Sequence, residues 1–165
     1  EKAKVFIKAG TGNRTITSQK TNQFFTQLDL NYNFNLNPKN SIYLKNQTFY
    51  LQSDDYVINE LFRFGGINSI RGFNENSLLA NAYTGIIAEY RYLVASNLYL
   101  HSITDFGYFQ DKTSNTKDQL LGLGFGFGLF TKNGLLNLVY ANGSTSDQAI
   151  KLSNSIVHIS FKTNF

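Results

Sequence analysis

Hydrophobic and polar residues alternate with a period of two along most of this chain. The alternation is clearest over residues 24–37, where even positions are mostly apolar and odd positions mostly carry amide or carboxylate groups. This period is typical of a β-strand whose two faces meet different surroundings. The segment is about twice as long as a usual globular strand. Its length suits a tilted strand that crosses a membrane, which takes about 9–11 residues.

The same alternation, clear or partial, marks seven further segments, so the sequence predicts eight strands. In chain order they cover residues 2–9, 24–37, 41–52, 82–92, 97–109, 119–130, 134–141 and 155–165. The connections alternate in length. Short ones cover residues 36–40, 95–97 and 132–134, and long ones cover 10–21, 53–80, 110–118 and 142–154. Outer-membrane barrels have short periplasmic turns and longer extracellular loops, so this rhythm assigns a topology.

Aromatic residues gather near the short connections, which resembles the aromatic girdle of a membrane barrel. They are Tyr32, Phe34, Tyr43, Tyr90, Tyr92, Tyr99, Phe161 and Phe165. The alternative is a soluble antiparallel sandwich or a lipocalin-like barrel, whose strands also alternate. Strand length and the scarcity of charge on the polar face favour the membrane. The predicted fold class is all-β, a transmembrane antiparallel β-barrel.

The composition excludes several other classes of protein. Charged residues make up 16% of the 165 residues, against about 25% in soluble domains. The longest apolar stretch, residues 120–130, is too short for a transmembrane helix. The net charge of +4 comes from scattered cations, so we expect no nucleic-acid partner. The chain has no cysteine, and its two histidines lie far apart in sequence. We therefore predict no catalytic residues, no cofactor and no metal site.

One long connection carries a motif. We call residues 53–80 the motif loop, and it contains the run Phe62-Arg-Phe-Gly-Gly-Ile-Asn-Ser-Ile-Arg-Gly-Phe73. This run resembles the sixth extracellular loop of the BamA-type barrel family, also called the bacterial surface antigen family. That family includes BamA, TamA, organelle import pores and the two-partner-secretion transporters. Further similarity at Glu89-Tyr90-Arg91 and Asp105-Phe106-Gly107 extends the resemblance over roughly residues 40–165.

The resemblance implies where this chain belongs in a larger barrel. In the family, the motif loop joins strands eleven and twelve of a sixteen-stranded barrel. Here five predicted strands follow the loop and three precede it. We therefore expect residues 1–165 to be the C-terminal part of the transmembrane barrel, its last eight strands. The first half of the barrel and the periplasmic POTRA domains are expected to precede it.

The resemblance also implies that the tip of the motif loop lies inside the barrel, with Arg71 held against acids of the wall. Glu89 falls on the polar face of its strand, and Asp105 shares a face with His101 on the next strand. Both carboxylates can therefore converge on one guanidinium. In the alternative, Glu89, Arg91 and Asp105 only line a wet lumen and pair with one another. The implied motif residues are Gly65, Gly66, Arg71, Gly72 and Phe73.

Glycines are expected to shape both the loop and the wall. Gly65, Gly66 and Gly72 fit positions where the backbone turns with positive φ. A second set forms a stripe without side chains on the lumenal face of one strand, where it can pack against the loop or let the wall bend. That stripe consists of Gly122, Gly124, Gly126 and Gly128.

The last predicted strand resembles the family's terminal strand, whose alternating apolar residues act as an insertion signal. The residues concerned are Val157, Ile159, Phe161 and Phe165. In BamA this strand also forms a weak seam with strand one of the barrel. The alternative is that Phe165 is only an interfacial anchor.

Taken with the resemblance, the sequence predicts a barrel of the BamA or TamA type in the bacterial outer membrane, which inserts or translocates proteins. The implied partners are outer-membrane lipid, unfolded outer-membrane or secreted client proteins, and accessory lipoproteins. Three alternatives stay open. They are a two-partner-secretion pore, the membrane anchor of a patatin-like lipase, and a self-contained small barrel of eight strands.

Overall fold

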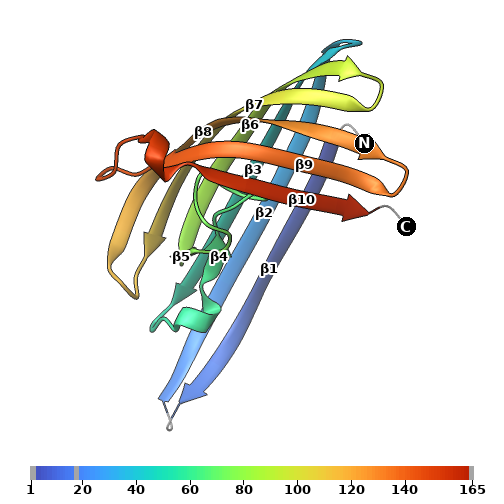
Figure 1. The fold of residues 1–165 in the computed structure, drawn as a ribbon. Helices are drawn as coiled ribbons and strands as arrows, with labels where there is room; N and C mark the ends of the chain where they lie inside the picture. Colours follow the sequence, from blue (N-terminus) through green and yellow to red (C-terminus); the bar gives the residue numbers. More distant parts are fainter. Residues whose placement is uncertain (1–2, 17–18, 164–165) are drawn as a thin grey trace.

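Eight long antiparallel strands form one curved sheet in the computed structural model, which describes residues 3–16 and 19–163 (Figure 1). Each strand pairs with the next in the order β1-β2-β3-β6-β7-β8-β9-β10. Their bounds are β1 Ala3–Ile16, β2 Gln19–Asn37, β3 Asn40–Ser53, β6 Ala82–Ala95, β7 Leu98–Asp111, β8 Thr116–Thr131, β9 Gly134–Ser144 and β10 Ile156–Thr163. The predicted antiparallel all-β class is confirmed, and the sheet is a partial barrel.

The described strands do not close on themselves. The strand order ends at β1 on one side and at β10 on the other, and no ladder joins these two within residues 3–16 and 156–163. A closed barrel needs every edge to be paired. The alternative of a self-contained barrel of eight strands therefore does not fit this sheet.

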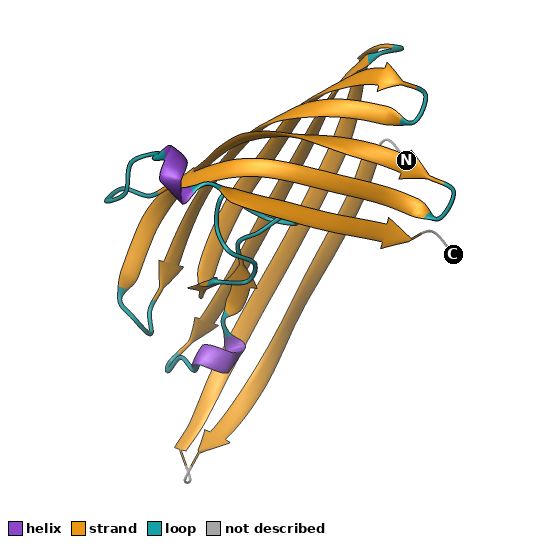
Figure 2. Cartoon of the chain, viewed as in Figure 1, coloured by secondary structure: helices purple, strands orange, loops and turns teal. Residues whose placement is uncertain are grey.

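The motif loop carries three further regular elements within the described residues. A 3-10 helix, η1 (Ile58–Glu60), is followed by a small hairpin of β4 (Phe62–Phe64) and β5 (Leu78–Ala80). Figure 2 shows that this segment lies inside the curve of the sheet. A second 3-10 helix, η2 (Leu152–Asn154), precedes β10. Within the described ranges, no helix has the length and hydrophobicity to cross a membrane.

Two of the predicted long loops are wrong. Residues 10–21 belong largely to the β1–β2 hairpin, in which the ladder continues to the pair Ile16 and Gln19. In the segment 110–118, only residues 112–115 form a turn, because β7 ends at Asp111 and β8 begins at Thr116. Asp111 accepts hydrogen bonds from Thr113 in this turn. The alternation of side chains stops in these segments because both faces become polar. A ladder of backbone hydrogen bonds does not need that alternation, so the strands continue.

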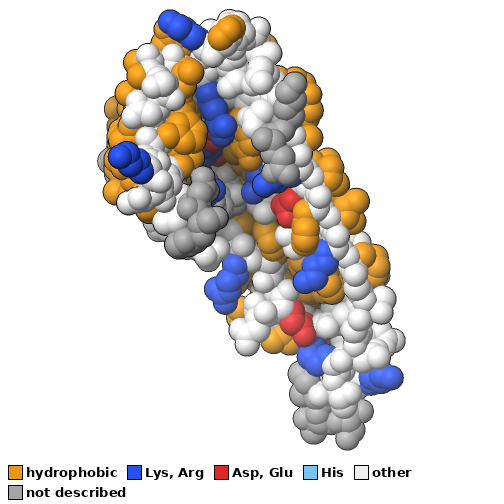
Figure 3. Space-filling view, turned by 90° about the vertical axis from the view of Figure 1, so that its right-hand side faces the viewer, with side chains coloured by type: hydrophobic (Ala, Val, Ile, Leu, Met, Phe, Trp, Pro, Cys, Tyr) orange, Lys and Arg blue, Asp and Glu red, His pale blue; other side chains and the backbone are white. Residues whose placement is uncertain are grey.

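The two faces of the sheet differ in chemistry. The convex face exposes hydrophobic side chains, among them Val5, Ile7, Leu30, Phe34, Ile86, Leu100, Phe106 and Phe125. Figure 3 shows charged side chains of both signs within the hollow and hydrophobic ones along the outer margin. Hydrophobic residues therefore lie outside and charge inside, the reverse of a soluble sandwich.

The predicted aromatic girdle is partly wrong. Tyr32, Phe34, Tyr90, Tyr92 and Phe161 are exposed as expected. Tyr43 and Tyr99 instead lie on the concave face, where their rings are 4.4 and 5.5 Å from the guanidinium carbon of Arg91. Their positions in the alternation of β3 and β7 turn them inward. Phe165 lies outside the described residues.

The core fills the concave side, between the motif loop and the wall. One buried cluster combines Phe64, Ile70 and Ala80 of the loop with Tyr83, Phe109 and Leu120 of the wall. The ring of Phe64 lies 4.2 Å from that of Tyr83 and 5.5 Å from that of Phe109. These contacts hold the loop against β6, β7 and β8, because buried aromatic pairs add to the hydrophobic effect.

Candidate functional site

Arg71 lies at the tip of the motif loop and is 1% exposed. Its Nε and Nη2 atoms donate hydrogen bonds of 2.7 and 2.6 Å to the two carboxylate oxygens of Asp105 on β7. Its backbone N–H donates a third, of 3.0 Å, to the same carboxylate. Nη1 donates to Glu89 on β6. We call Arg71, Glu89 and Asp105 the Arg71 cluster.

The charges of the Arg71 cluster are balanced by a second cation. The Nε and Nη2 atoms of Arg91 each lie 2.7 Å from Oε2 of Glu89. The lumenal pairing of Glu89 with Arg91 thus coexists with the contact between Glu89 and Arg71. Burial alone would lower the pKa of Arg71, but the hydrogen bonds and charges of Asp105 and Glu89 outweigh it and raise that pKa. Arg71 therefore stays charged.

Glycines shape the backbone around Arg71. Gly65, Gly66 and Gly72 have φ values of 101, 98 and 87°, in the region that favours glycine. The turn before Arg71 is closed by a 2.7 Å hydrogen bond from the N–H of Gly65 to the hydroxyl of Ser69. A Cβ on Gly66 would overlap the carboxylate of Glu75. The loop-tip conformation thus depends on glycine at these three positions.

The wall also lacks side chains where the loop tip touches it. A Cβ on Gly122 would overlap the backbone oxygen of Arg71, and one on Gly143 would overlap that of Gly72. The side chain of Ile70 lies close to Gly85 and Gly107, with its Cδ1 atom 3.2 and 3.1 Å from a Cβ added at these positions. Of the predicted stripe, Gly122 alone has the loop among its nearest neighbours. Three others instead adjoin neighbouring wall residues, and they are Gly124, Gly126 and Gly128.

His158 joins the last described strand to the loop tip. Its Nε2 atom accepts a 3.2 Å hydrogen bond from the N–H of Gly72. The side chain is 7% exposed and comes from β10. In the sequence, the two histidines served only to argue against a catalytic or metal site, and this contact was not predicted. The place of His158 on the polar face of the last strand was the one available signal.

The remaining predicted residues lie apart from the Arg71 cluster. Phe73 is half-buried and packs against the core cluster around Phe64. On the convex face of β10, three hydrophobic residues are 51 to 66% exposed, and they are Val157, Ile159 and Phe161. Within residues 3–16 and 19–163, no three His, Cys, Asp or Glu side chains are grouped so that they can bind a metal ion.

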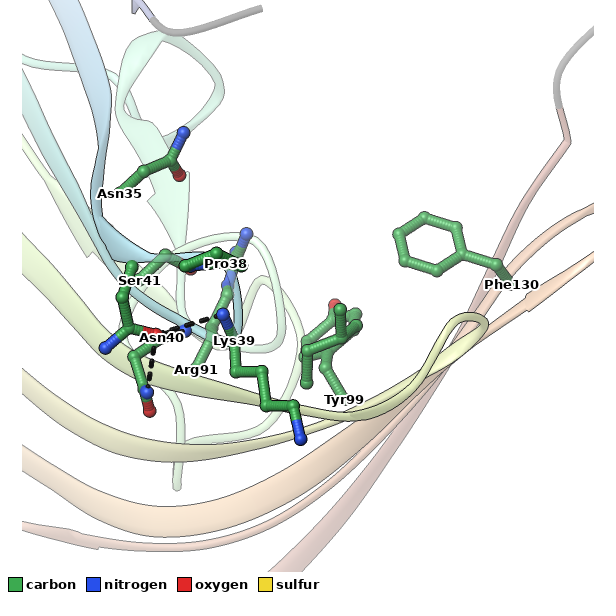
Figure 4. A pocket seen from close by; sticks show the side chains of 10 residues that line it. Asn35, Pro38, Lys39, Asn40, Ser41, Arg91, Tyr99 and Phe130 are labelled. Atoms are coloured by element: carbon green, nitrogen blue, oxygen red, sulfur yellow. Dashed lines mark hydrogen bonds between the residues drawn. The ribbon is translucent and has the colours of Figure 1, made fainter.

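Two cavities lie on the concave side near the short turns. The outer one, of about 410 Å³, forms a mouth whose lining includes Asn35, Lys39, Asn40, Tyr99 and Phe130 (Figure 4). The inner one, of about 210 Å³, lies beneath the Arg71 cluster. Arg91, Tyr99 and Phe130 line both cavities, so the two adjoin.

Comparison with known proteins gives one family. Haemolysin secretion/activation proteins of the ShlB/FhaC/HecB family match residues 5–129. That match runs from β1 through most of β8 and includes the whole Arg71 cluster. No curated protein matches the chain.

Proposed function

The chain belongs to the haemolysin secretion/activation family ShlB/FhaC/HecB, and on that premise we propose that it forms part of the pore that secretes one partner protein. Members of this family are outer-membrane β-barrels that transport proteins in two-partner secretion. The observation that carries the proposal is the Arg71 cluster, which holds a loop inside the curve of such a wall. The proposed function moves a protein across the membrane and involves no covalent step.

The Arg71 cluster determines the free energy needed to displace the motif loop from the wall. A polypeptide that passes through the barrel needs the space that the motif loop fills. Breaking a buried ion pair by removing one partner costs about 3–5 kcal/mol. The loop is therefore a stable obstruction at rest, and secretion requires a client that displaces it. The exposed hydrophobic residues of the convex face are the surface that meets outer-membrane lipid.

The same proposal covers the architecture beyond the described strands. Residues 1–165 form the C-terminal half of a sixteen-stranded barrel, with POTRA domains and the first barrel half preceding them in the full protein. The outer edge of β1 has no partner strand among residues 3–16 and 19–163, which supports this, since lipid does not tolerate an open edge. The apolar face of β10 serves as the insertion signal, with Val157, Ile159 and Phe161 exposed on it.

A second candidate is insertion of outer-membrane proteins, the finer prediction of the BamA and TamA type. One observation favours it. The outer edge of β10 has no partner among the described strands, and β10 has 8 residues against 14 in β1. A short edge strand offers few hydrogen bonds to a neighbour, so it can separate and pair with a client strand. Accessory lipoproteins would belong to this candidate.

Secretion from cells separates the two candidates. The test deletes the gene for the full-length protein and measures the partner protein in the medium, together with the folded outer-membrane proteins of the cell. We expect loss of the partner from the medium and unchanged levels of the other barrels. Arg71→Ala should reduce secretion, because the loop that Arg71 holds also braces the wall through the core cluster around Phe64. Lys117→Ala, on an exposed end of β8, should not. A general loss of outer-membrane barrels would overturn the secretion pore and favour insertion.

A further inference from the structure

The inner cavity beneath the Arg71 cluster is strongly cationic. Four positive side chains line it, from three strands and the motif loop, and they are Lys45, Arg71, Arg91 and Lys162. Glu89 is the one carboxylate in its lining. Counting Asp105, which pairs with Arg71, and Asp29, whose charge acts on Lys45, the site keeps an excess of one positive charge.

Two of these cations form no ion pair with a carboxylate in the described part of the chain. Lys45 donates a 2.8 Å hydrogen bond to the backbone oxygen of Asn68, and no ion pair involving it lies within that part. Lys162, on β10, likewise has no ion pair there. Unpaired charge in a partly enclosed space attracts the opposite charge more strongly than a charge on an open surface does.

The guanidinium of Arg91 is held in a fixed position in the lining of the inner cavity. Its guanidinium carbon lies 4.4 Å from the ring centre of Tyr43 and 5.5 Å from that of Tyr99. Glu89 accepts from its Nε and Nη2 atoms, while Nη1 has no partner among the described residues. A planar group fixed in this way loses little freedom when it binds a carboxylate.

The route into the inner cavity suits an extended chain more than a small ion. The mouth is bordered by amide side chains, including Asn35, Asn37 and Asn40, with Lys39 at its rim (Figure 4). Asn37 and Asn40 are hydrogen-bonded to each other, so within residues 3–16 and 19–163 Asn35 is the lining asparagine whose amide can pair with an extended peptide backbone. An acidic side chain of that peptide would then reach the cations beyond Arg91.

We propose that the inner cavity is a binding site for acidic side chains of a polypeptide that enters from the short-turn side. The inference rests on the proposed secretion function and names the chemistry of the client segment that first engages the pore. A carboxylate there contacts Arg91, Lys45 and Lys162.

The test measures binding of hexaglutamate to the purified full-length protein in detergent, by calorimetry at 0.05 and 0.15 M salt. Hexaglutamine is the uncharged probe, and inorganic phosphate is the small-anion probe. We expect hexaglutamate to bind about tenfold tighter than hexaglutamine and to weaken with salt. The variant Lys45→Gln/Lys162→Gln should lower hexaglutamate affinity about tenfold, and adding Arg91→Gln should lower it further.

The matched control is Lys132→Gln, which removes an exposed cation from a short turn outside both cavities. It should leave affinity within about twofold. Heat-modifiable migration on gels checks that each variant is folded. The double variant keeps the Arg71 cluster, so it stays informative if the triple variant fails to fold.

Equal affinity of the double variant and the wild type would overturn the proposal. So would equal binding of the two peptides, or tighter binding of phosphate than of hexaglutamate. A negative result here leaves the secretion measurement unaffected, so the two failures are distinguishable.

Discussion

Arg71 and Asp105 are joined by three hydrogen bonds, two from the guanidinium and one from the backbone N–H of Arg71. The backbone bond matters as much as the ion pair, because it fixes the loop chain itself against β7. A lysine at position 71 would keep the charge but lose the forked geometry that fits both carboxylate oxygens. The pair therefore positions the loop tip as well as neutralising a buried charge.

Asp105→Asn should release the loop more than Glu89→Gln. Asp105 accepts three bonds from Arg71, whereas Glu89 accepts one and is shared with Arg91. Loss of Asp105 should cost about 3–5 kcal/mol, and loss of the Glu89 charge about 1.5–3 kcal/mol. The readout is the labelling rate of a cysteine introduced as Ser69→Cys, at a site that is 6% exposed. The sulfur is a weak acceptor for the N–H of Gly65, so every variant is compared with Ser69→Cys alone.

In that assay, Asp105→Asn should speed labelling by at least about a hundredfold over the wild-type wall. Charge exchange supplies the control. Arg71→Glu should impair secretion, and Asp105→Arg or Glu89→Arg in the same protein should restore part of it. Failure of both exchanges, with labelling unchanged in Asp105→Asn, would show that the cluster does not hold the loop.

Gly122→Ala should disturb loop packing, while Gly12→Ala should not. A Cβ on Gly122 would overlap the backbone oxygen of Arg71, which cannot move without breaking the bond from Arg71 to Asp105. Overpacking of this kind costs about 1–3 kcal/mol. At Gly12 the nearest atom is 3.9 Å from the added carbon. The temperature at which the folded band on a gel converts to the unfolded band should fall for Gly122→Ala and stay unchanged for Gly12→Ala. An equal fall in both variants would contradict the packing argument.

The alternation of hydrophobic and polar residues was sufficient to predict the eight strands. It also predicted that Glu89 and Asp105 lie on the polar faces of their strands. A strand between lipid and a wet lumen keeps its alternation, and counting by two from one polar residue places the others. The same counting failed beyond the membrane, where residues 10–16 are polar on both faces and still continue β1. It also gave no reason to expect β7 to extend to Asp111.

Contacts between distant segments could not be read from that pattern. The hydrogen bond from Gly72 to His158 spans 86 positions in sequence. The fit of Gly72 against Gly143 likewise depends on how far the loop enters the hollow. The resemblance indicated Arg71, the alternation indicated Glu89 and Asp105, and Gly122 was among the glycines predicted to pack against the loop. The contact of Gly143 with Gly72 could not be predicted, because it depends on the curvature of the sheet.

His158→Leu should weaken the link between β10 and the loop, and His158→Gln should weaken it less. Leucine leaves the buried N–H of Gly72 without an acceptor, at a cost of about 1–3 kcal/mol. The amide oxygen of glutamine can replace the ring nitrogen as acceptor. Labelling of Ser69→Cys should therefore rise in the order wild type, His158→Gln, His158→Leu. Identical rates in the two variants would mean that the side-chain volume matters and the hydrogen bond does not.

Arg14→Ala should loosen the base of the motif loop without moving its tip. The β1–β2 hairpin projects beyond the neighbouring strands (Figure 1), and from it Arg14 contacts Glu60 at 2.5 Å and Asp55 at 3.1 Å. Exposed or half-exposed ion pairs are worth about 0.2–1 kcal/mol each, so the effect should be small and local.

Cleavage after Glu60 by a glutamate-specific protease measures that local opening, because Glu60 lies in η1 at the base of the loop. Arg14→Ala should raise the cleavage rate about two- to fivefold. Arg63→Ala is the matched control, since Arg63 is exposed in β4 and forms no ion pair within the described residues. Labelling of Ser69→Cys should stay at the wild-type rate in both variants. If Arg14→Ala instead raises labelling as much as cleavage, the base and the tip of the loop open as one unit, and the Arg71 cluster does not hold the tip by itself.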